Sequence, residues 1–117
     1  LLRNYPGNYP LQFIEADLLL KQQNYAAAEQ AINRLASQRT GDPDVWYLAA
    51  EIRGLAGNIL GVHLARAEYF MLTGDTDQAG EQLDLALKRA NGSFVMSSRI
   101  RARQDELARQ RRQIESL

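Results

Sequence analysis

The sequence predicts an all-α protein, a stack of about six antiparallel helices paired into three hairpins. Apolar residues recur at helical spacing in segments of about 13 to 16 residues, and no segment shows the period-two alternation of a strand. Gly, Asn, Asp and Pro separate these segments by only about two to five residues, so neighbouring helices are expected to be antiparallel. A thin row of such hairpins buries each helix only against its neighbours, which is typical of helical repeats.

Composition fits a small globular domain and argues against several functions. The chain has 117 residues, of which 45% are hydrophobic, as in ordinary folded proteins. Lys plus Arg and Asp plus Glu both number 14, and this zero net charge argues against a general nucleic-acid or membrane-surface binder. The absence of cysteine excludes disulfides and thiolate metal sites. No apolar run reaches the roughly 20 residues of a membrane-spanning helix, so we expect no membrane insertion.

The first two helices are predicted over about 11–22 and 25–37, with a turn at Gln23 and Asn24 between them. Both carry apolar residues at helical spacing: Leu11, Ile14, Leu18 and Leu19 in the first, and Ala28, Ala31, Ile32 and Leu35 in the second. Gly41 breaks the second helix, and Asp42 is placed to cap the third.

The third and fourth helices are predicted over about 43–56 and 59–73. Pro43 suits a first helical turn, and Gly57 with Asn58 is typical of a helix end followed by a turn. The fourth segment is apolar around much of its circumference: Leu60, Leu64, Ala67, Phe70 and Met71. Gly74 ends it.

The fifth helix is predicted over about 76–90, and Ser93 is a suitable cap for a sixth. The sixth has a thin apolar stripe of Ile100, Leu107 and Ile114 and is crowded with arginine: Arg99, Arg101, Arg103, Arg109, Arg111 and Arg112. We interpret it as a polar cap that ends the stack. An acidic-partner surface, or an edge against a companion domain, is the alternative. RNA binding is disfavoured because the rest of the chain supplies no basic surface.

Two turns in the chain resemble those of tetratricopeptide repeats. The segments 21–30 and 72–82 both lead into a small residue near the start of the next helix, Ala28 and Ala79. Small residues in the preceding helices match as well, as does an aromatic: Ala16, Ala50, Ala67 and Trp46. The resemblance implies a right-handed stack with a concave face. Gln12 and Arg53 depart from the family's aromatic positions.

The spacing of the two turns leaves the repeat frame open. Ala28 and Ala79 are 51 residues apart, one and a half times the 34-residue period of this family. The fourth helix therefore either closes the second hairpin or opens the third.

The candidate partner-binding residues lie on the predicted concave face. Phe13 and Tyr47 fall on the position that faces the groove, where contact with a ligand and simple packing are both open. Asp17 and Glu51 follow four residues later on the same helix faces, and Lys21 and Glu68 are expected to join them. Trp46 and Phe70 are expected in the core. A groove of aromatic residues ringed by charge suits an extended or helical peptide.

A closer resemblance involves the segments 42–51, 63–70 and 98–103, above all Ala65-Arg66-Ala67-Glu68-Tyr69. Together they are similar to the C-terminal tetratricopeptide region of bacterial periplasmic zinc metalloproteases of the beta-barrel assembly-enhancing type. This implies a periplasmic docking module cut from a longer protein, whose missing protease domain holds zinc at a His-Glu-x-x-His motif. The implied partners are outer-membrane β-barrel assembly components or precursors, and the protease domain itself.

Residues 1–117 are thus expected to form one domain that acts as a protein-interaction scaffold. A regulatory domain that gates the missing protease, or a generic adaptor, is the alternative. His63 is the only histidine, and a zinc site needs three or four ligands, so we expect no metal, cofactor or catalytic residue in this chain.

Overall fold

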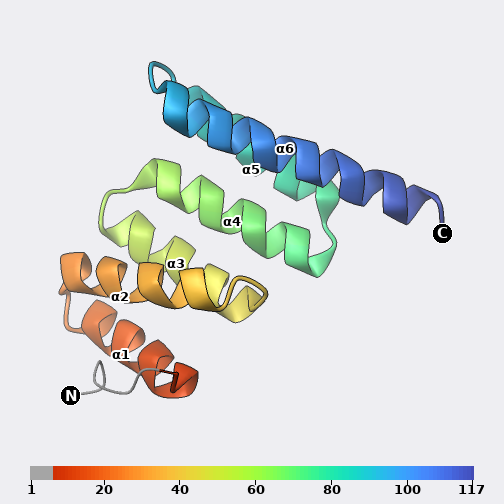
Figure 1. Cartoon of the computed structure of the whole chain (residues 1–117). Coiled ribbons are helices and arrows are strands. Elements are labelled where there is room, and N and C mark those ends of the chain that lie inside the picture. The colour runs from red at the N-terminus through yellow and green to blue at the C-terminus, as the bar shows by residue number, and fades with distance from the viewer. Residues whose placement is uncertain (1–6) are drawn as a thin grey trace.

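The computed structural model describes residues 7–117, which form six α-helices and, within that range, no strand (Figure 1). The helices are α1 (Tyr9–Lys21), α2 (Tyr25–Gln38), α3 (Pro43–Leu55), α4 (Ile59–Thr73), α5 (Thr76–Arg89) and α6 (Phe94–Glu115). The prediction of six helices in three hairpins is confirmed, and each predicted boundary lies within two residues of the observed one. In the described part of the chain, no helix is both long and apolar enough to cross a bilayer.

Capping side chains explain why the helices begin where they do. Five of the six helices start after a side chain that accepts a hydrogen bond from a backbone N–H of the first turn: Asn8, Asp42, Asn58, Asp75 and Ser93. At the other end of α4, Gly74 adopts a left-handed conformation with φ of 83°, which an L side chain rarely takes.

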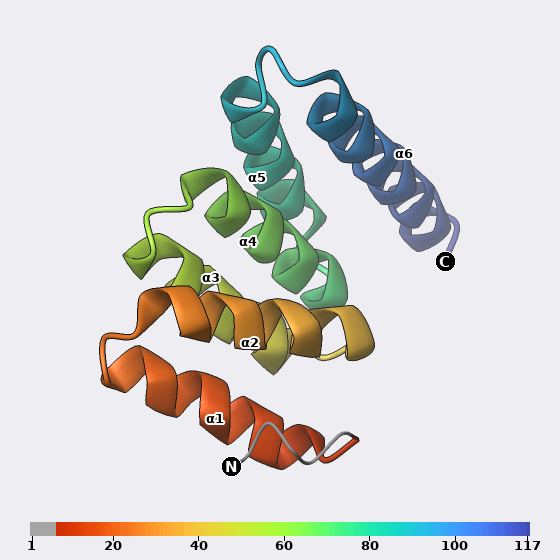
Figure 2. The same cartoon turned by 60° about the vertical axis from the view of Figure 1, so that its left-hand side comes forward.

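The helices form a thin, extended stack. Each packs mainly on the helices before and after it, with α1 at one end and α6 at the other (Figures 1 and 2). The Cα radius of gyration is 14.9 Å and the extents are 46 × 36 × 20 Å. A compact domain of this length has a radius of gyration of about 13 Å, so the chain is elongated as a helical repeat requires.

Two hydrophobic cores meet at α4. One core joins α1, α2 and α3 to Ala65 of α4, and the other joins α5 and α6 to Ala67 of α4. Residues two apart point to nearly opposite sides of a helix, because each residue turns the helix by about 100°. A helix buried on two sides must be apolar on both, which accounts for the apolar sequence of α4.

The helices recur at the 34-residue period despite the irregular spacing of the small residues. Tyr9 and Pro43, the first residues of α1 and α3, are 34 apart, as are Tyr25 and Ile59, the first residues of α2 and α4. The starts of α5 and α6 depart from this period by one residue. The open frame is therefore resolved: α4 closes the second hairpin, and its opposite face also packs on α5.

Two expectations about the core need correction. Ala50, matched to a small buried position, is only half-buried, and Ala49 beside it is fully buried instead. Trp46 and Phe70 are partly buried at the edges of the two cores rather than inside them. In both cases the rotation of α3 against α4 decides the outcome, and helical spacing alone does not define that rotation.

Arg53 stands where the repeat pattern expects an aromatic, and it links three helices. Its guanidinium donates to the Gly61 carbonyl oxygen (3.0 Å) and to Asn33 Oδ1 (2.9 Å), and lies 5.9 Å from the Trp46 ring centre. Burial lowers the pKa of Arg53. At this position the Arg53 guanidinium forms hydrogen bonds to α2 and α4, where an aromatic side chain would form apolar contacts.

Gly61 has no room for a side chain. A Cβ there would lie 2.5 Å from Asn58 Nδ2 and 2.8 Å from Arg53 Cδ. Gly61→Ala is therefore expected to lower the free energy of unfolding by about 1–2 kcal/mol, because it disturbs the Asn58 cap.

Gly80→Ala is the matched control. The nearest atom to its new Cβ is at 3.5 Å, so the better helix propensity of alanine should add up to about 1 kcal/mol. Urea unfolding measures the change in the free energy of unfolding for both variants. Changes of the same sign would contradict the conclusion that Gly61 has no room for a side chain.

Candidate protein-interaction groove

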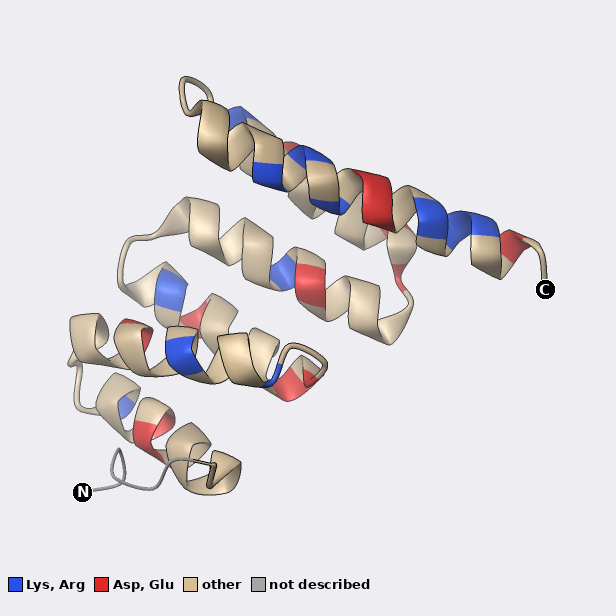
Figure 3. Ribbon diagram, viewed as in Figure 1, with Lys and Arg blue, Asp and Glu red and all other residues tan. Residues whose placement is uncertain are grey.

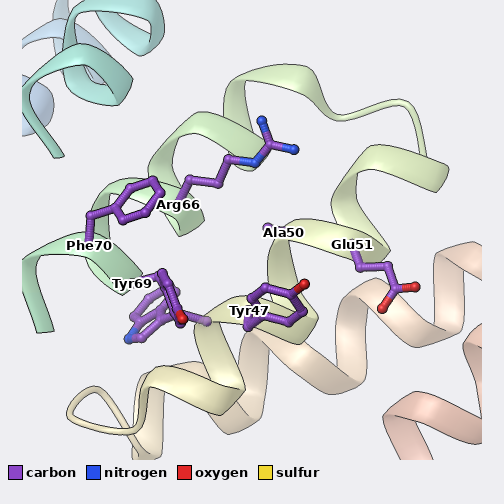
Figure 4. Close-up of a pocket in the computed structure, with 7 residues that line it drawn as sticks. Tyr47, Ala50, Glu51, Arg66, Tyr69 and Phe70 are labelled. Carbon is purple, nitrogen blue, oxygen red and sulfur yellow. The ribbon is translucent and has the colours of Figure 1, made fainter. Parts of the chain in front are cut away.

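A hollow of about 390 Å³ opens between α3 and α4 (Figure 4). The antiparallel hairpin brings together residues that the sequence separates by roughly one helix and a turn. The lining residues are Trp46, Tyr47, Ala50 and Glu51 from α3, and Arg66, Tyr69 and Phe70 from α4. We call this hollow the aromatic groove.

Three of the four aromatic residues that line the aromatic groove have their rings in contact with one another. The ring centres of Tyr47 and Tyr69 are 5.6 Å apart with planes at 55°, and those of Tyr69 and Phe70 are 5.5 Å apart with planes at 72°. These are favourable tilted and edge-to-face geometries. Tyr47 is nevertheless 65% exposed. The cluster therefore offers a preformed apolar surface to solvent, with phenol hydroxyls that can form hydrogen bonds.

Opposite charges flank the aromatic groove. Arg66 extends from α4 and Glu51 from α3, and both are exposed (Figure 4). Within residues 7–117 neither side chain is in an ion pair. Both charges are therefore available to a bound molecule.

Two charged residues of α1 predicted for the concave face, Asp17 and Lys21, form an ion pair within that helix. Lys21 Nζ is 2.9 Å from Asp17 Oδ2. The hydrogen bond and charge of Asp17, and more weakly the charge of Glu51, raise the pKa of Lys21. Of the three predicted residues Asp17, Lys21 and Glu51, the first two form an ion pair.

Phe13 is separate from the aromatic groove. It lines a second hollow, of about 370 Å³, between the start of α1 and the start of α3, together with Tyr9, Arg39 and Val45. Arg39 covers the Tyr9 ring there, with its guanidinium carbon 4.7 Å from the ring centre. The predicted anchors Phe13 and Tyr47 therefore occupy neighbouring hollows rather than one.

Glu68, predicted with the other concave-face residues, lies apart from the aromatic groove. It does not line the aromatic groove. Its carboxylate accepts two hydrogen bonds from Arg103 of α6, at 2.8 Å to Nε and 2.7 Å to Nη2. Glu68 lies one residue before Tyr69, and a rotation of about 100° turns it toward α6. Its role is to hold the last helix on the stack.

Figure 3 shows Lys and Arg residues along much of α6. The arginines of α6 divide into two groups, according to whether they form an ion pair within residues 7–117. Arg103 binds Glu68, Arg109 pairs with Glu106, and Arg111 donates to Thr76 O (2.9 Å) and Asp77 Oδ1 (3.0 Å). The others are exposed and form no ion pair in the described part of the chain: Arg99, Arg101 and Arg112. Half of the predicted basic residues are thus engaged: two bind residues of other helices, and one forms an ion pair within α6.

The apolar stripe of α6 is shorter than predicted. Ile100 and Leu107 are buried against the second core, but Ile114 is exposed. The reason is length, since α6 has 22 residues and α5 has 14. The C-terminal end of α6 therefore extends past the stack.

Sequence reasoning missed Arg66 as a groove residue and left Tyr69 without a role. Both lie on one face of α4, because they are three residues apart. That spacing does not show that α3 is the helix which this face meets. His63 Nδ1 lies 2.8 Å from Gln82 Oε1 of α5, which is the distance of a hydrogen bond between two helices. Among residues 7–117 no group of three or more potential metal ligands lies close enough together to hold an ion.

Comparison with known families finds a match over the first part of the chain. Residues 1–52 match the tetratricopeptide repeat family, and this match includes α1, α2 and most of α3. No curated protein matches the chain significantly. The fold is an all-α, tetratricopeptide-like helical stack. Repeats of this family generally mediate protein–protein interaction, so the match implies a protein partner.

Proposed function

We propose that this chain is a docking module that binds an extended or helical segment of another protein in the aromatic groove. The observation that carries the proposal is a partly exposed cluster of three rings between two charges that have no ion-pair partner within residues 7–117. Aromatic and arginine side chains dominate binding energy at protein interfaces.

Burial of the rings would supply the binding free energy. Tyr47 contributes little to the core because it is mostly exposed. Covering apolar surface stabilises a complex by about 25 cal/mol per Å², before the cost of ordering the partner is subtracted. Rings already held in contact lose little freedom on binding, which favours affinity.

The two charges would set the direction of the bound segment. Arg66 favours an acidic group at one side of the groove and Glu51 a basic group at the other. Complementary charges at an interface contribute mostly to specificity and association rate. A segment with apolar or aromatic residues between an acidic and a basic residue fits best.

We further propose that the module belongs to a periplasmic zinc metalloprotease of the beta-barrel assembly-enhancing type, with the zinc in a protease domain outside this chain. Support comes from the resemblance in the segment 65–69, since Arg66 and Tyr69 within it line the aromatic groove. Strands of outer-membrane barrels alternate apolar and polar residues and carry aromatics at both ends. Such strands, in an unfolded precursor, are the proposed occupants.

Fluorescence anisotropy tests the class of substrate. The probe is a labelled 12-residue barrel-strand peptide with alternating apolar residues, and its control is a scrambled peptide of the same composition. We expect saturable binding of the strand peptide and at least about ten-fold weaker binding of the scrambled one, a difference of about 1.4 kcal/mol. Equal affinities would reject barrel strands as the preferred class while leaving a general docking role in place.

A further inference from the structure

The outer face of α1 is apolar, and no helix within residues 7–117 covers it. Leu11, Ile14 and Leu18 recur on it at helical spacing, and Ile14 and Leu18 are 53% and 48% exposed. The opposite side of α1 is buried through Ala16 and Leu20 in the first core. Because α1 lies at the end of the stack (Figures 1 and 2), no described helix follows on this face.

The corresponding face of α3 is buried, and it shows which kind of element can cover the face of α1. The helices α1 and α3 both have 13 residues and begin 34 apart, so their positions correspond one to one. The three apolar residues of α1 correspond to three of α3: Leu11 to Val45, Ile14 to Leu48 and Leu18 to Ile52. Those of α3 are only 2%, 5% and 0% exposed.

In α3 this face packs on the preceding hairpin. Its three residues belong to the core that joins α1, α2 and α3, and Val45 lines a hollow together with Leu35 of α2. The entry into the helix is equivalent too, since the capping residues Asn8 and Asp42 are 34 apart and both cap with a side-chain oxygen. The face of α1 therefore repeats an interface that the structure already contains.

We infer that the outer face of α1 binds an amphipathic helix from a partner, packed as α2 packs on α3. The partner helix must carry an apolar face like that of α2, whose buried residues are Ala28, Ala31, Ile32, Leu35 and Ala36. One position differs, because Glu15 replaces the fully buried Ala49. The docking helix must therefore offer a basic or amide side chain there. This surface is distinct from the aromatic groove, and the inference is independent of the proposed function.

A second copy of the chain fits this face poorly. The opposite end of the stack is α6, whose outer surface carries Arg99, Arg101 and Arg112 as exposed charges. Head-to-tail stacking would place these charges on the apolar residues of α1, with the desolvation cost of an unpaired charge. The matching surface is the apolar face of a helix like α2.

An added hairpin tests the inference directly. Residues 8–41 are duplicated immediately before residue 8 of the chain, which places the copied α2 against α1 in the 34-residue register. If the face accepts such a helix, the fused protein should unfold in one transition with a melting midpoint at least about 4 °C above that of the original chain. Glu15→Ala in the original α1 should increase this gain, because α3 has an alanine, Ala49, at the corresponding position.

The double substitution Ile14→Glu/Leu18→Glu, made in the original α1, provides the decisive comparison. Without the added hairpin it should shift the melting midpoint by less than about 2 °C, since both residues are exposed; with the hairpin it should abolish the gain. Leu85→Glu, at an exposed position of α5, should leave the gain intact. If circular dichroism shows that the double variant is unfolded, Leu18→Ser replaces it.

Three results would overturn the inference. They are no gain in the fused protein, a gain that survives the substitutions on α1, and dimerisation of the original chain in sedimentation that those substitutions abolish. The last result would identify a second copy as the occupant.

Discussion

Replacing Tyr47 and Tyr69 together by alanine is expected to weaken binding of a groove ligand by at least about thirty-fold, or about 2 kcal/mol. The two rings are in contact at 5.6 Å and form the surface that the partner would cover. The variant should keep its helical circular dichroism spectrum, because Tyr47 is largely exposed and Tyr69 is only partly buried. Titration of the labelled strand peptide measures the loss.

Phe94→Ala is the matched control for this loss. Phe94 is an exposed aromatic at the start of α6, outside the aromatic groove. Its removal deletes a similar apolar area and should leave the affinity unchanged. Equal weakening by Phe94→Ala, or unchanged binding by the double tyrosine variant, would show that the groove is not the binding surface.

Leu83→Ala is expected to cause the largest loss of stability, about 2–5 kcal/mol in the free energy of unfolding. Leu83 is fully buried at the centre of the second core, where α4, α5 and α6 meet. Deleting its branched end leaves a cavity that a thin stack cannot fill by moving a neighbouring layer. Domains of this size have only about 5–15 kcal/mol in total, so this loss would be a large fraction of the stability.

Leu85→Ala tests whether that loss comes from the core. Leu85 lies two residues further along α5 and is 41% exposed, so the same chemical change should cost less than about 1 kcal/mol. Urea unfolding followed by circular dichroism compares the two variants. Similar losses would contradict the assignment of Leu83 to a core that holds α6 on the stack.

The sequence predicted the helices well because their ends are local events. Asp42 and Ser93 cap α3 and α6 with their own side chains, and Gly74 ends α4 in a conformation that favours glycine. Such signals depend on residues within one turn of each other. The antiparallel pairing then follows from the short loops.

What the sequence could not predict is which neighbour covers each helix face. Helical spacing shows that Glu68 and Tyr69 point in different directions, but not that α6 lies on one side and α3 on the other. The same limit applies to Arg66, whose position in the groove depends on the rotation of α4 against α3. Packing of the whole stack determines these contacts.

The spacing of the small residues Ala28 and Ala79 did not indicate the repeat frame. Ala28 and Ala79 both mark a close helix contact, yet they belong to different cores. The regular quantity is the position of the helix starts, which the turn residues already indicated. Ile114 illustrates a further limit, because its apolar spacing continues where α5 no longer lies beside α6.

Photocrosslinking tests the groove most directly. p-Azidophenylalanine replaces Tyr47 in one variant and Leu85 in another, and each is irradiated with the labelled strand peptide at equal occupancy. Position 47 lines the aromatic groove, whereas position 85 lies on the exposed side of α5, away from it. Docking in the groove predicts strong crosslinking from position 47, competed by unlabelled peptide, and background crosslinking from position 85. Equal yields from the two positions, or a yield from position 47 that competitor does not reduce, would contradict it.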